Sequence, residues 1–230
     1  MRINAIVQAR MGSTRLPGKV MKVIEGKPLI GHIFDRLKKV RGIEKIFLAT
    51  TVDPRNDSLV EYAMQERVEA YRHKEENDII GRLYNILSLD NADAFLKING
   101  DCPLIDPNII IKGIVKYKKK INADILTNKI SDTLPLGFSF EIISAKAVTW
   151  CNTHLKSRED RELAIMWIIN NKKQFPKQFS ISYEKNYGSY NLCVDTEEDF
   201  KLICLIFKKL YKKNKYFGIE DVISFIKKDL

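Results

Sequence analysis

Strand-like and helix-like segments alternate along most of this chain, and the alternation limits its fold more than any other feature. Short apolar runs, such as residues 3–9 and 45–51, indicate buried strands. Between them, apolar residues recur at the spacing of amphipathic helices. This order predicts a mostly parallel sheet with helices on both faces. We expect strands near residues 3–9, 45–51, 69–72, 94–98, 123–127, 137–143, 178–184 and 190–194, and helices near residues 28–40, 59–64, 79–87, from 107, 144–154, 159–173 and twice more at the C-terminal end.

The rhythm of strands and helices changes after about residue 125. The 230 residues therefore predict one three-layer α/β domain, Rossmann-like, with a small inserted β subregion at roughly 125–185. No apolar run approaches the ~20 residues that span a bilayer. The N-terminal residues lack the long apolar stretch of a secretory signal. We therefore expect a cytoplasmic protein with no membrane partner.

A net charge of +10 raises nucleic acid as a partner. The lysines gather in runs such as residues 116–120 and 212–213, which are typical of solvated helix faces. No helix-turn-helix, zinc-finger or aromatic RNA-binding motif accompanies them. We expect no nucleic-acid partner, and a basic nucleic-acid-binding module is kept only as a non-enzymatic alternative.

The cysteines show neither a C-x-x-C pair nor the spacing of a zinc site, and in a chain of this length they do not indicate a disulfide framework. We expect buried free thiols at all four positions, Cys102, Cys151, Cys193 and Cys204.

The first predicted strand leads into a basic, glycine-containing loop, residues 8–19 (QARMGSTRLPGK). Ligands favour the carboxyl ends of strands in an open α/β sheet, and glycines such as Gly12 let the backbone approach a polyphosphate. Arg10 and Arg15 offer bidentate donors, and Lys19 offers a point charge. The loop is not a Walker A motif, because the spacing is one residue too long and the magnesium-binding hydroxyl is missing. A basic surface loop with turn glycines is the alternative.

Two aspartates follow predicted strands and have no evident structural role. Asp106 is the natural cap of the helix that begins at residue 107, which leaves Asp101 without a local partner. Thr196 and Asp199 resemble a capping box, which leaves Asp195 outside the next helix. Carboxylates are the ligands that Mg²⁺ or Mn²⁺ needs in phosphoryl chemistry. The alternative is that either aspartate only favours a turn.

Motifs spread over most of the chain resemble one family. The loop 8–19, Ala49-Thr50-Thr51, residues 99–107 (NGDCPLIDP) and residues 194–200 (VDTEEDF) are similar to the superfamily of CMP-KDO synthetases and acylneuraminate cytidylyltransferases. They resemble most closely its spore coat polysaccharide biosynthesis protein F branch. The resemblance implies a GT-A-like nucleotidyltransferase fold and transfer of CMP from CTP to an acidic sugar or related surface-glycan precursor. It also implies release of pyrophosphate, dependence on Mg²⁺ and a homodimer, for which exposed apolar residues of the 125–160 region would serve.

The resemblance and the residue patterns together predict a set of site residues. One of them is Arg82, for which the alternative role is a helical ion pair with Asp78, four residues earlier. The predicted residues are Lys19, Arg15 and Asp101 for catalysis; Ala9, Arg10, Gly12, Ser13, Arg15, Lys19, Arg82 and Asn99 for the nucleotide; Asp101 and Asp195 for the metal; and Asn128, Glu141 and Arg161 for the acceptor.

The chain departs from the family pattern at two places. Ser139 replaces an aspartate common in relatives, and Leu163 replaces a histidine. Both fall in the region expected to bind the acceptor, so the acceptor could be unusual. Two alternatives stay open: a metal-dependent glycosyltransferase of similar fold that uses a nucleotide sugar, and a family member that binds nucleotide without turnover.

Overall fold

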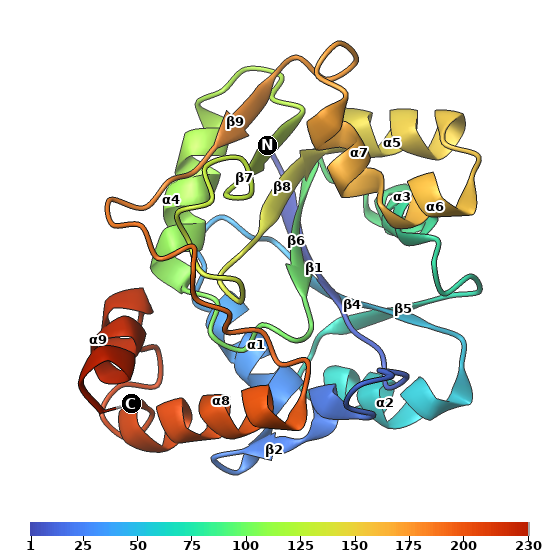
Figure 1. Ribbon diagram of the computed structural model, residues 1–230. Helices are drawn as coiled ribbons and strands as arrows, with labels where there is room; N and C mark the ends of the chain where they lie inside the picture. The colour runs from blue at the N-terminus through green and yellow to red at the C-terminus, as the bar shows by residue number, and fades with distance from the viewer. Residues whose placement is uncertain (230) are drawn as a thin grey trace.

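A central seven-stranded sheet organises the computed structural model, which describes residues 1–229 (Figure 1). The strands are β1 (Ile3–Gln8), β2 (Val23–Ile24), β3 (Lys27–Pro28), β4 (Ile46–Thr51), β5 (Glu69–His73), β6 (Ala94–Asn99), β7 (Ile125–Thr127), β8 (Glu141–Ser144) and β9 (Gln178–Ser180). The sheet order is β5-β4-β1-β6-β8-β7-β9, and β2 pairs with β3 in a separate hairpin. Neighbouring strands run parallel except β8, which is antiparallel to β6 and β7.

Helices follow most of the strands and cover both faces of the sheet (Figure 1). They are α1 (Leu29–Leu37), α2 (Asp57–Gln65), α3 (Ile79–Asp90), α4 (Pro107–Lys118), α5 (Ala145–His154), α6 (Arg158–Glu162), α7 (Ala164–Asn170), α8 (Glu197–Leu210) and α9 (Ile219–Asp229), with short 3₁₀ turns η1 (Lys19–Met21) and η2 (Pro54–Asn56).

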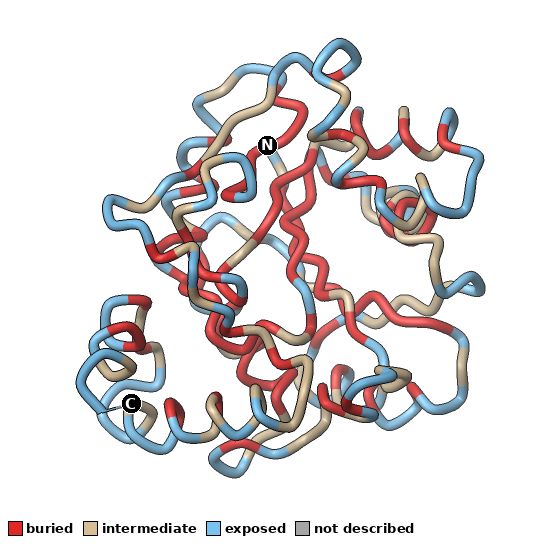
Figure 2. The backbone as a smooth tube through the Cα atoms, viewed as in Figure 1, coloured by how far each residue is buried: buried red, intermediate tan, exposed pale blue. Residues whose placement is uncertain are grey.

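Two hydrophobic cores lie on opposite faces of the sheet. In β1, Ile3, Ala5 and Val7 pack into the core that holds apolar residues of α1, α2, α4, α8 and α9. Ile6 points the other way, into the core with α3, α5 and α7. Both faces of the central strands are therefore buried, as Figure 2 shows in red, which is why these strands are apolar throughout. The predicted three-layer, mostly parallel α/β fold is confirmed.

Two predicted elements differ in the structure. The helix expected over 159–173 is two helices, because Ser157 caps α6 and the backbone leaves helical geometry at Leu163 before α7 begins. The strand expected over 190–194 does not form. Its residues bond instead to loop ends: Asn191 pairs with Leu136 in an isolated bridge, and the Val194 N–H donates to the Asp101 carbonyl at 2.9 Å.

Within residues 1–229, no helix has both the length and the apolar character needed to cross a membrane.

Candidate active site

The basic loop after β1 is closed and anchored by backbone hydrogen bonds. The Gly18 N–H donates to the Met11 carbonyl at 2.9 Å, and the Met11 N–H donates to Oδ1 of the buried Asn56 at 2.8 Å. Gly18 has φ of 70°, a left-handed conformation that glycine adopts without strain. Among the described residues, the backbone N–H groups of Gly12 and Ser13 have no hydrogen-bond partner. The loop therefore holds free donors in place, as a phosphate-binding loop requires.

A cleft of about 380 Å³ opens where the loop meets the carboxyl ends of β1 and β6. Most of the predicted catalytic, nucleotide-binding and metal-binding residues line it, although they come from distant parts of the chain. Gly12 lies in an adjoining hollow, where Arg55 reaches over it. The cleft-lining residues from that set are Ala9, Arg10, Ser13, Arg15, Lys19, Arg82, Asn99, Asp101 and Asp195.

Lys19 lies between the two predicted metal ligands. Its Nζ is 3.0 Å from Oδ2 of Asp101 and 2.9 Å from Oδ1 of Asp195, and it also donates to the Val194 carbonyl at 2.7 Å. Arg15 pairs with the other oxygen of Asp195 at 3.0 Å. The tertiary structure thus brings Asp101 and Asp195 to the Lys19 ammonium, at the C-terminal end of the loop 8–19.

Burial alone would lower the pKa of Lys19, but its contacts with Asp101 and Asp195 outweigh burial and raise the pKa. The ammonium is therefore charged at neutral pH. Two carboxylates that already converge on one cation suit a hard divalent ion, which prefers oxygen ligands. Asp101 and Asp195 could hold such an ion once Lys19 turns toward a phosphate.

Arg10 and Arg82 form the opposite, basic wall of the cleft. Arg10 pairs with Glu76, and the buried Arg82 donates to the Glu76 carbonyl at 2.7 Å. The Nε atom of Arg82 is buried without a hydrogen-bond partner among the described residues. Burial, and then the nearby charge of Arg10, lower the pKa of Arg82. A phosphate or a polar ligand atom would satisfy this orphaned donor.

The helical ion pair considered between Asp78 and Arg82 is wrong. Asp78 caps α3 by accepting from the Gly81 N–H at 2.8 Å, and its carboxylate takes two hydrogen bonds from Arg161, each 2.9 Å long. Arg161 also donates to the carbonyl groups of Asn152 and Leu155. Its guanidinium is occupied in joining α3 to the α5–α6 region, and it lies outside the lining of the cleft.

The other two predicted acceptor residues are buried beside β8 and also lie outside the cleft lining among residues 1–229. The Asn128 amide donates to Oγ of Ser139 and accepts from the Phe140 N–H, both at 3.2 Å. Ser139, one of the two departures from the family pattern, therefore supports this turn. The Asn128 amide therefore holds the turn before β8 in position, and these two hydrogen bonds occupy it.

Glu141 forms a buried ionic cluster. It accepts from Lys129 at 2.8 Å and from Lys97 at 3.4 Å. Burial would raise its pKa, but the two ammonium groups lower it. Lys97 also donates to Oδ1 of Asn99 at 2.7 Å and so orients a cleft residue. Glu141 is thus linked to the cleft through Lys97 and Asn99.

Several cleft residues escaped the sequence analysis. Gln8 has a buried Nε2 without a partner within residues 1–229, and its place in the loop motif was a usable signal. Glu76 and Glu162 line the cleft from segments whose charged sequences resemble ordinary surface. Asn56 anchors the loop from η2, and no local pattern marks this long-range contact.

The prediction that all four cysteines are buried free thiols is confirmed only in part. All four cysteines are free, as expected, but only Cys102 and Cys151 are buried. Cys193 and Cys204 are half-buried, because each lies where a loop or helix face meets solvent.

The same family emerges from comparison with known proteins. Residues 4–220 match the family model described as cytidylyltransferase. A protein of Methanocaldococcus jannaschii, described as uncharacterized, is 31% identical over 232 residues, which cover 100% of this chain and 92% of that protein. The spore coat polysaccharide biosynthesis protein SpsF of Bacillus subtilis is 26% identical over 90% of this chain and 85% of its own length. The solved structure of a cytidylyltransferase from Leptospira borgpetersenii superposes with a TM-score of 0.93 at 29% identity, over 100% of this chain and 95% of that one.

The fold and the family match together define a nucleotidyltransferase. More particularly, the chain belongs to the cytidylyltransferase family, within which it is similar to the SpsF branch.

Proposed function

We propose that this chain transfers CMP from CTP to an acidic sugar or a related surface-glycan precursor and releases pyrophosphate. The observation that carries the proposal is the convergence of Asp101, Asp195 and Lys19 at the open end of the glycine loop. Family membership supports CTP as the donor, and the similarity to a polysaccharide biosynthesis protein supports a glycan precursor as the acceptor.

The triphosphate would lie along the loop. Free N–H groups of Gly12 and Ser13 would donate to its oxygens, and Arg10 and Arg15 would pair with its charge once they leave Glu76 and Asp195. Binding thus exchanges ion pairs within the protein for ion pairs with the nucleotide, so the arginines are held near their targets before CTP arrives.

In the transfer step, an acceptor hydroxyl oxygen forms a bond to the α-phosphorus of CTP. The bond from that phosphorus to the oxygen shared with the β-phosphate breaks, pyrophosphate leaves, and the hydroxyl proton passes to water. Lys19 and Arg15 stabilise the charge that grows on the leaving group. When bound by Asp101 and Asp195, Mg²⁺ or Mn²⁺ would offset the negative charge of the phosphates.

The first test measures pyrophosphate release from CTP in the presence of Mg²⁺ and a panel of acidic sugars, with neutral sugar phosphates as comparison. We expect release that depends on one acidic sugar and stops with a chelator. Asp101→Asn should lower the rate at least about 100-fold, because it removes one of the two carboxylates proposed to hold the metal ion. Glu61→Gln on the exposed face of α2 is the matched control and should leave the rate unchanged.

Release of a nucleoside diphosphate from a nucleotide sugar would instead establish the glycosyltransferase alternative. Tight CTP binding without turnover for any acceptor would establish a binding protein.

We also propose a homodimer that acts in the cytoplasm, where CTP is made. The exposed side chains of Ile130 and Leu136 support an interface in the 125–160 region. The protein's mass in solution tests the dimer.

A further inference from the structure

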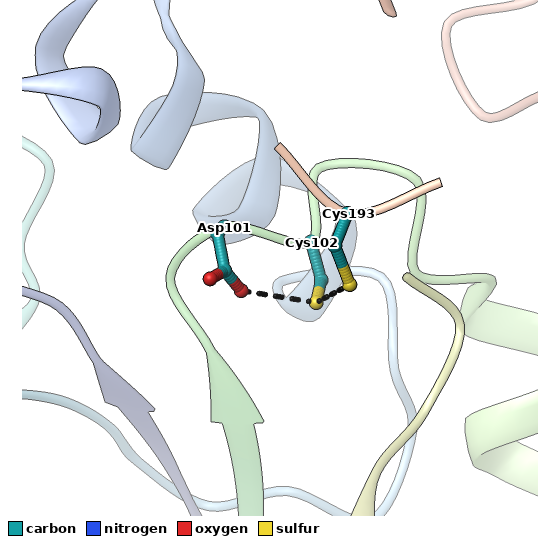
Figure 3. Close-up of side chains that lie close together, drawn as sticks. All are labelled: Asp101, Cys102 and Cys193. Atoms are coloured by element: carbon teal, nitrogen blue, oxygen red, sulfur yellow. Dashed lines mark hydrogen bonds between the residues drawn. The ribbon is translucent and has the colours of Figure 1, made fainter. Parts of the chain in front are cut away.

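Two cysteines and one aspartate form a compact cluster next to the cleft (Figure 3). Cys102 follows Asp101 in the loop after β6, and Cys193 lies in the segment between β9 and α8 that leads to Asp195. The Sγ atoms of Cys102 and Cys193 are 3.5 Å apart, and Sγ of Cys102 is 3.3 Å from Oδ1 of Asp101. The three ligand atoms all lie within 4.8 Å of one another.

The two segments that carry the cluster are held in register. The Val194 N–H donates to the Asp101 carbonyl at 2.9 Å, and the Cys193 N–H donates to Oδ1 of Asn191 at 3.2 Å. On the other side, a side chain at Gly137 would lie 3.1 Å from the Cys193 nitrogen, so the backbone packs closely there. These backbone contacts hold the two thiols beside each other, and the hydrogen bonds of Cys102 to Cys193 and Asp101 add to them.

The two separations that involve Cys102 fit a tetrahedral metal site. With Zn–S distances of about 2.3 Å and Zn–O distances of about 2.0–2.2 Å, neighbouring ligands on zinc lie about 3.8 Å apart for two sulfurs and about 3.5 Å apart for sulfur and oxygen. The distances from Cys102 Sγ to Cys193 Sγ and to Asp101 Oδ1 are within a few tenths of an ångström of those values, and the third pair of ligand atoms lies within 4.8 Å.

We propose that Cys102, Cys193 and Asp101 bind a thiophilic divalent cation such as Zn²⁺. Cys102 is buried, whereas Cys193 and Asp101 are half-buried, so the cluster is accessible to solvent on one side and a bound ion can keep one coordination position open. Thiolates select such a cation over Mg²⁺, which prefers oxygen ligands alone.

Asp101 divides its carboxylate between two neighbours. Oδ1 faces the cysteines, and Oδ2 contacts Lys19 at 3.0 Å. A cation on the cysteines would therefore draw Asp101 away from the cleft. If the proposed function is correct, Zn²⁺ inhibits CMP transfer at low concentration, although the binding site itself does not depend on that function.

The test is a titration of the fully reduced protein with Co²⁺, whose absorption reports thiolate ligands directly and needs no substrate. We expect a sulfur-to-cobalt charge-transfer band that saturates at one equivalent and is displaced by one equivalent of Zn²⁺. Cys193→Ser should lose about half of the band intensity and bind Co²⁺ at least tenfold more weakly. Cys204→Ser, a half-buried thiol of α8 outside the cluster, is the matched control and should behave as wild type.

Asp195→Asn separates this site from the proposed magnesium site, because Asp195 belongs only to the magnesium site, and it should leave the Co²⁺ band and affinity unchanged. Asp101→Asn should weaken Co²⁺ binding yet keep the band intensity per bound ion, because both thiolates remain. Thermal unfolding of each variant checks its folding, and Cys193→Ala replaces Cys193→Ser if the serine variant is unfolded.

Three results would overturn the proposal. The first is no charge-transfer band in wild-type protein whose four thiols all react with a thiol reagent. The second is a band that survives intact in both Cys193 variants. The third is the loss of two thiols, counted in denatured protein that has not been treated with reductant, in wild type but not in Cys193→Ser, which would show that Cys102 and Cys193 form a disulfide in solution.

Discussion

The Lys19 ammonium joins the two aspartates of the cleft. Its side chain is only 10% exposed, and its charge balances carboxylates that would otherwise repel one another across a partly buried space. The same group is placed to contact a triphosphate, so one cation stabilises the free site and prepares it for its ligand.

Lys19→Met tests this double role. Loss of one charge-assisted contact to the triphosphate should weaken CTP binding about 10- to 100-fold, and the unpaired carboxylates should lower the unfolding temperature. Calorimetry and thermal unfolding measure the two effects. Lys22→Met is the control, because Lys22 forms a partly exposed pair with Glu197 just after η1. It should change the CTP affinity and the unfolding temperature only slightly. Equal CTP affinity in wild type and Lys19→Met would contradict the assignment.

At the scale of elements, the cleft depends on how closely the ends of β1 and β6 approach. The Gly100 N–H donates to the Gln8 carbonyl at 2.7 Å. A Cβ atom at Gly100 would lie 2.5 Å from Cβ of Ala9 and 2.9 Å from the Gln8 oxygen. Only glycine lets the Asp101 loop lie against the start of the phosphate loop, so this position links two motifs that are distant in sequence.

Gly100→Ala should therefore separate the two loops. We expect a loss of about 1–3 kcal/mol in the free energy of unfolding and, in the folded fraction, CTP binding weakened at least tenfold. Gly113→Ala in α4 is the matched control, since its Cβ would meet the Phe140 ring at 2.6 Å but lies outside the cleft. It should lose stability and keep its affinity. A Gly100→Ala protein that binds CTP normally would show that close approach is unnecessary.

At the scale of the whole molecule, Asp78 and Arg161 tie the helices on one face of the sheet together. Arg161 in α6 donates twice to Asp78 at the start of α3 and also to the end of α5. Burial alone would raise the pKa of Asp78, but the hydrogen bonds from Arg161 and Gly81 lower it. The ionised carboxylate is thus part of the folded structure.

This shift gives stability a defined pH dependence. Because the folded pKa lies below the unfolded value of about 3.9, the contribution of Asp78 is fully present above that value and is lost as the pH falls through the folded pKa. Asp78→Asn should cost about 1.5–3 kcal/mol at pH 7, and its difference from wild type should shrink as the pH falls below the unfolded value. Urea unfolding across pH measures it, with Asp57→Asn from an exposed pair as the control. A constant difference at every pH would contradict the role of the ionised group.

Most of the fold was predictable because its signals are local. Apolar periodicity located most helices and most strands, although α6 and α7 were predicted as one helix, and the caps at Asp106 and Thr196 formed as expected. The prediction was wrong where a chain segment bonds outside its own neighbourhood. Within residues 190–194, Asn191 and Leu192 pair with Leu136 and Val194 bonds to Asp101, so these residues are not a strand of the sheet.

The sequence alone determined the alternation of strands and helices, the glycine loop and the two aspartates without a capping role, because each depends on residues a few positions apart. Only the tertiary structure decided which of these groups meet. Lys19 contacts Asp101 and Asp195 across 82 and 176 residues, and Arg161 turns to Asp78 across 83. Such contacts depend on the order of strands in the sheet, and that order places the loop after β1 beside the loop after β6. No local pattern of residues encodes how close these two loops lie in space.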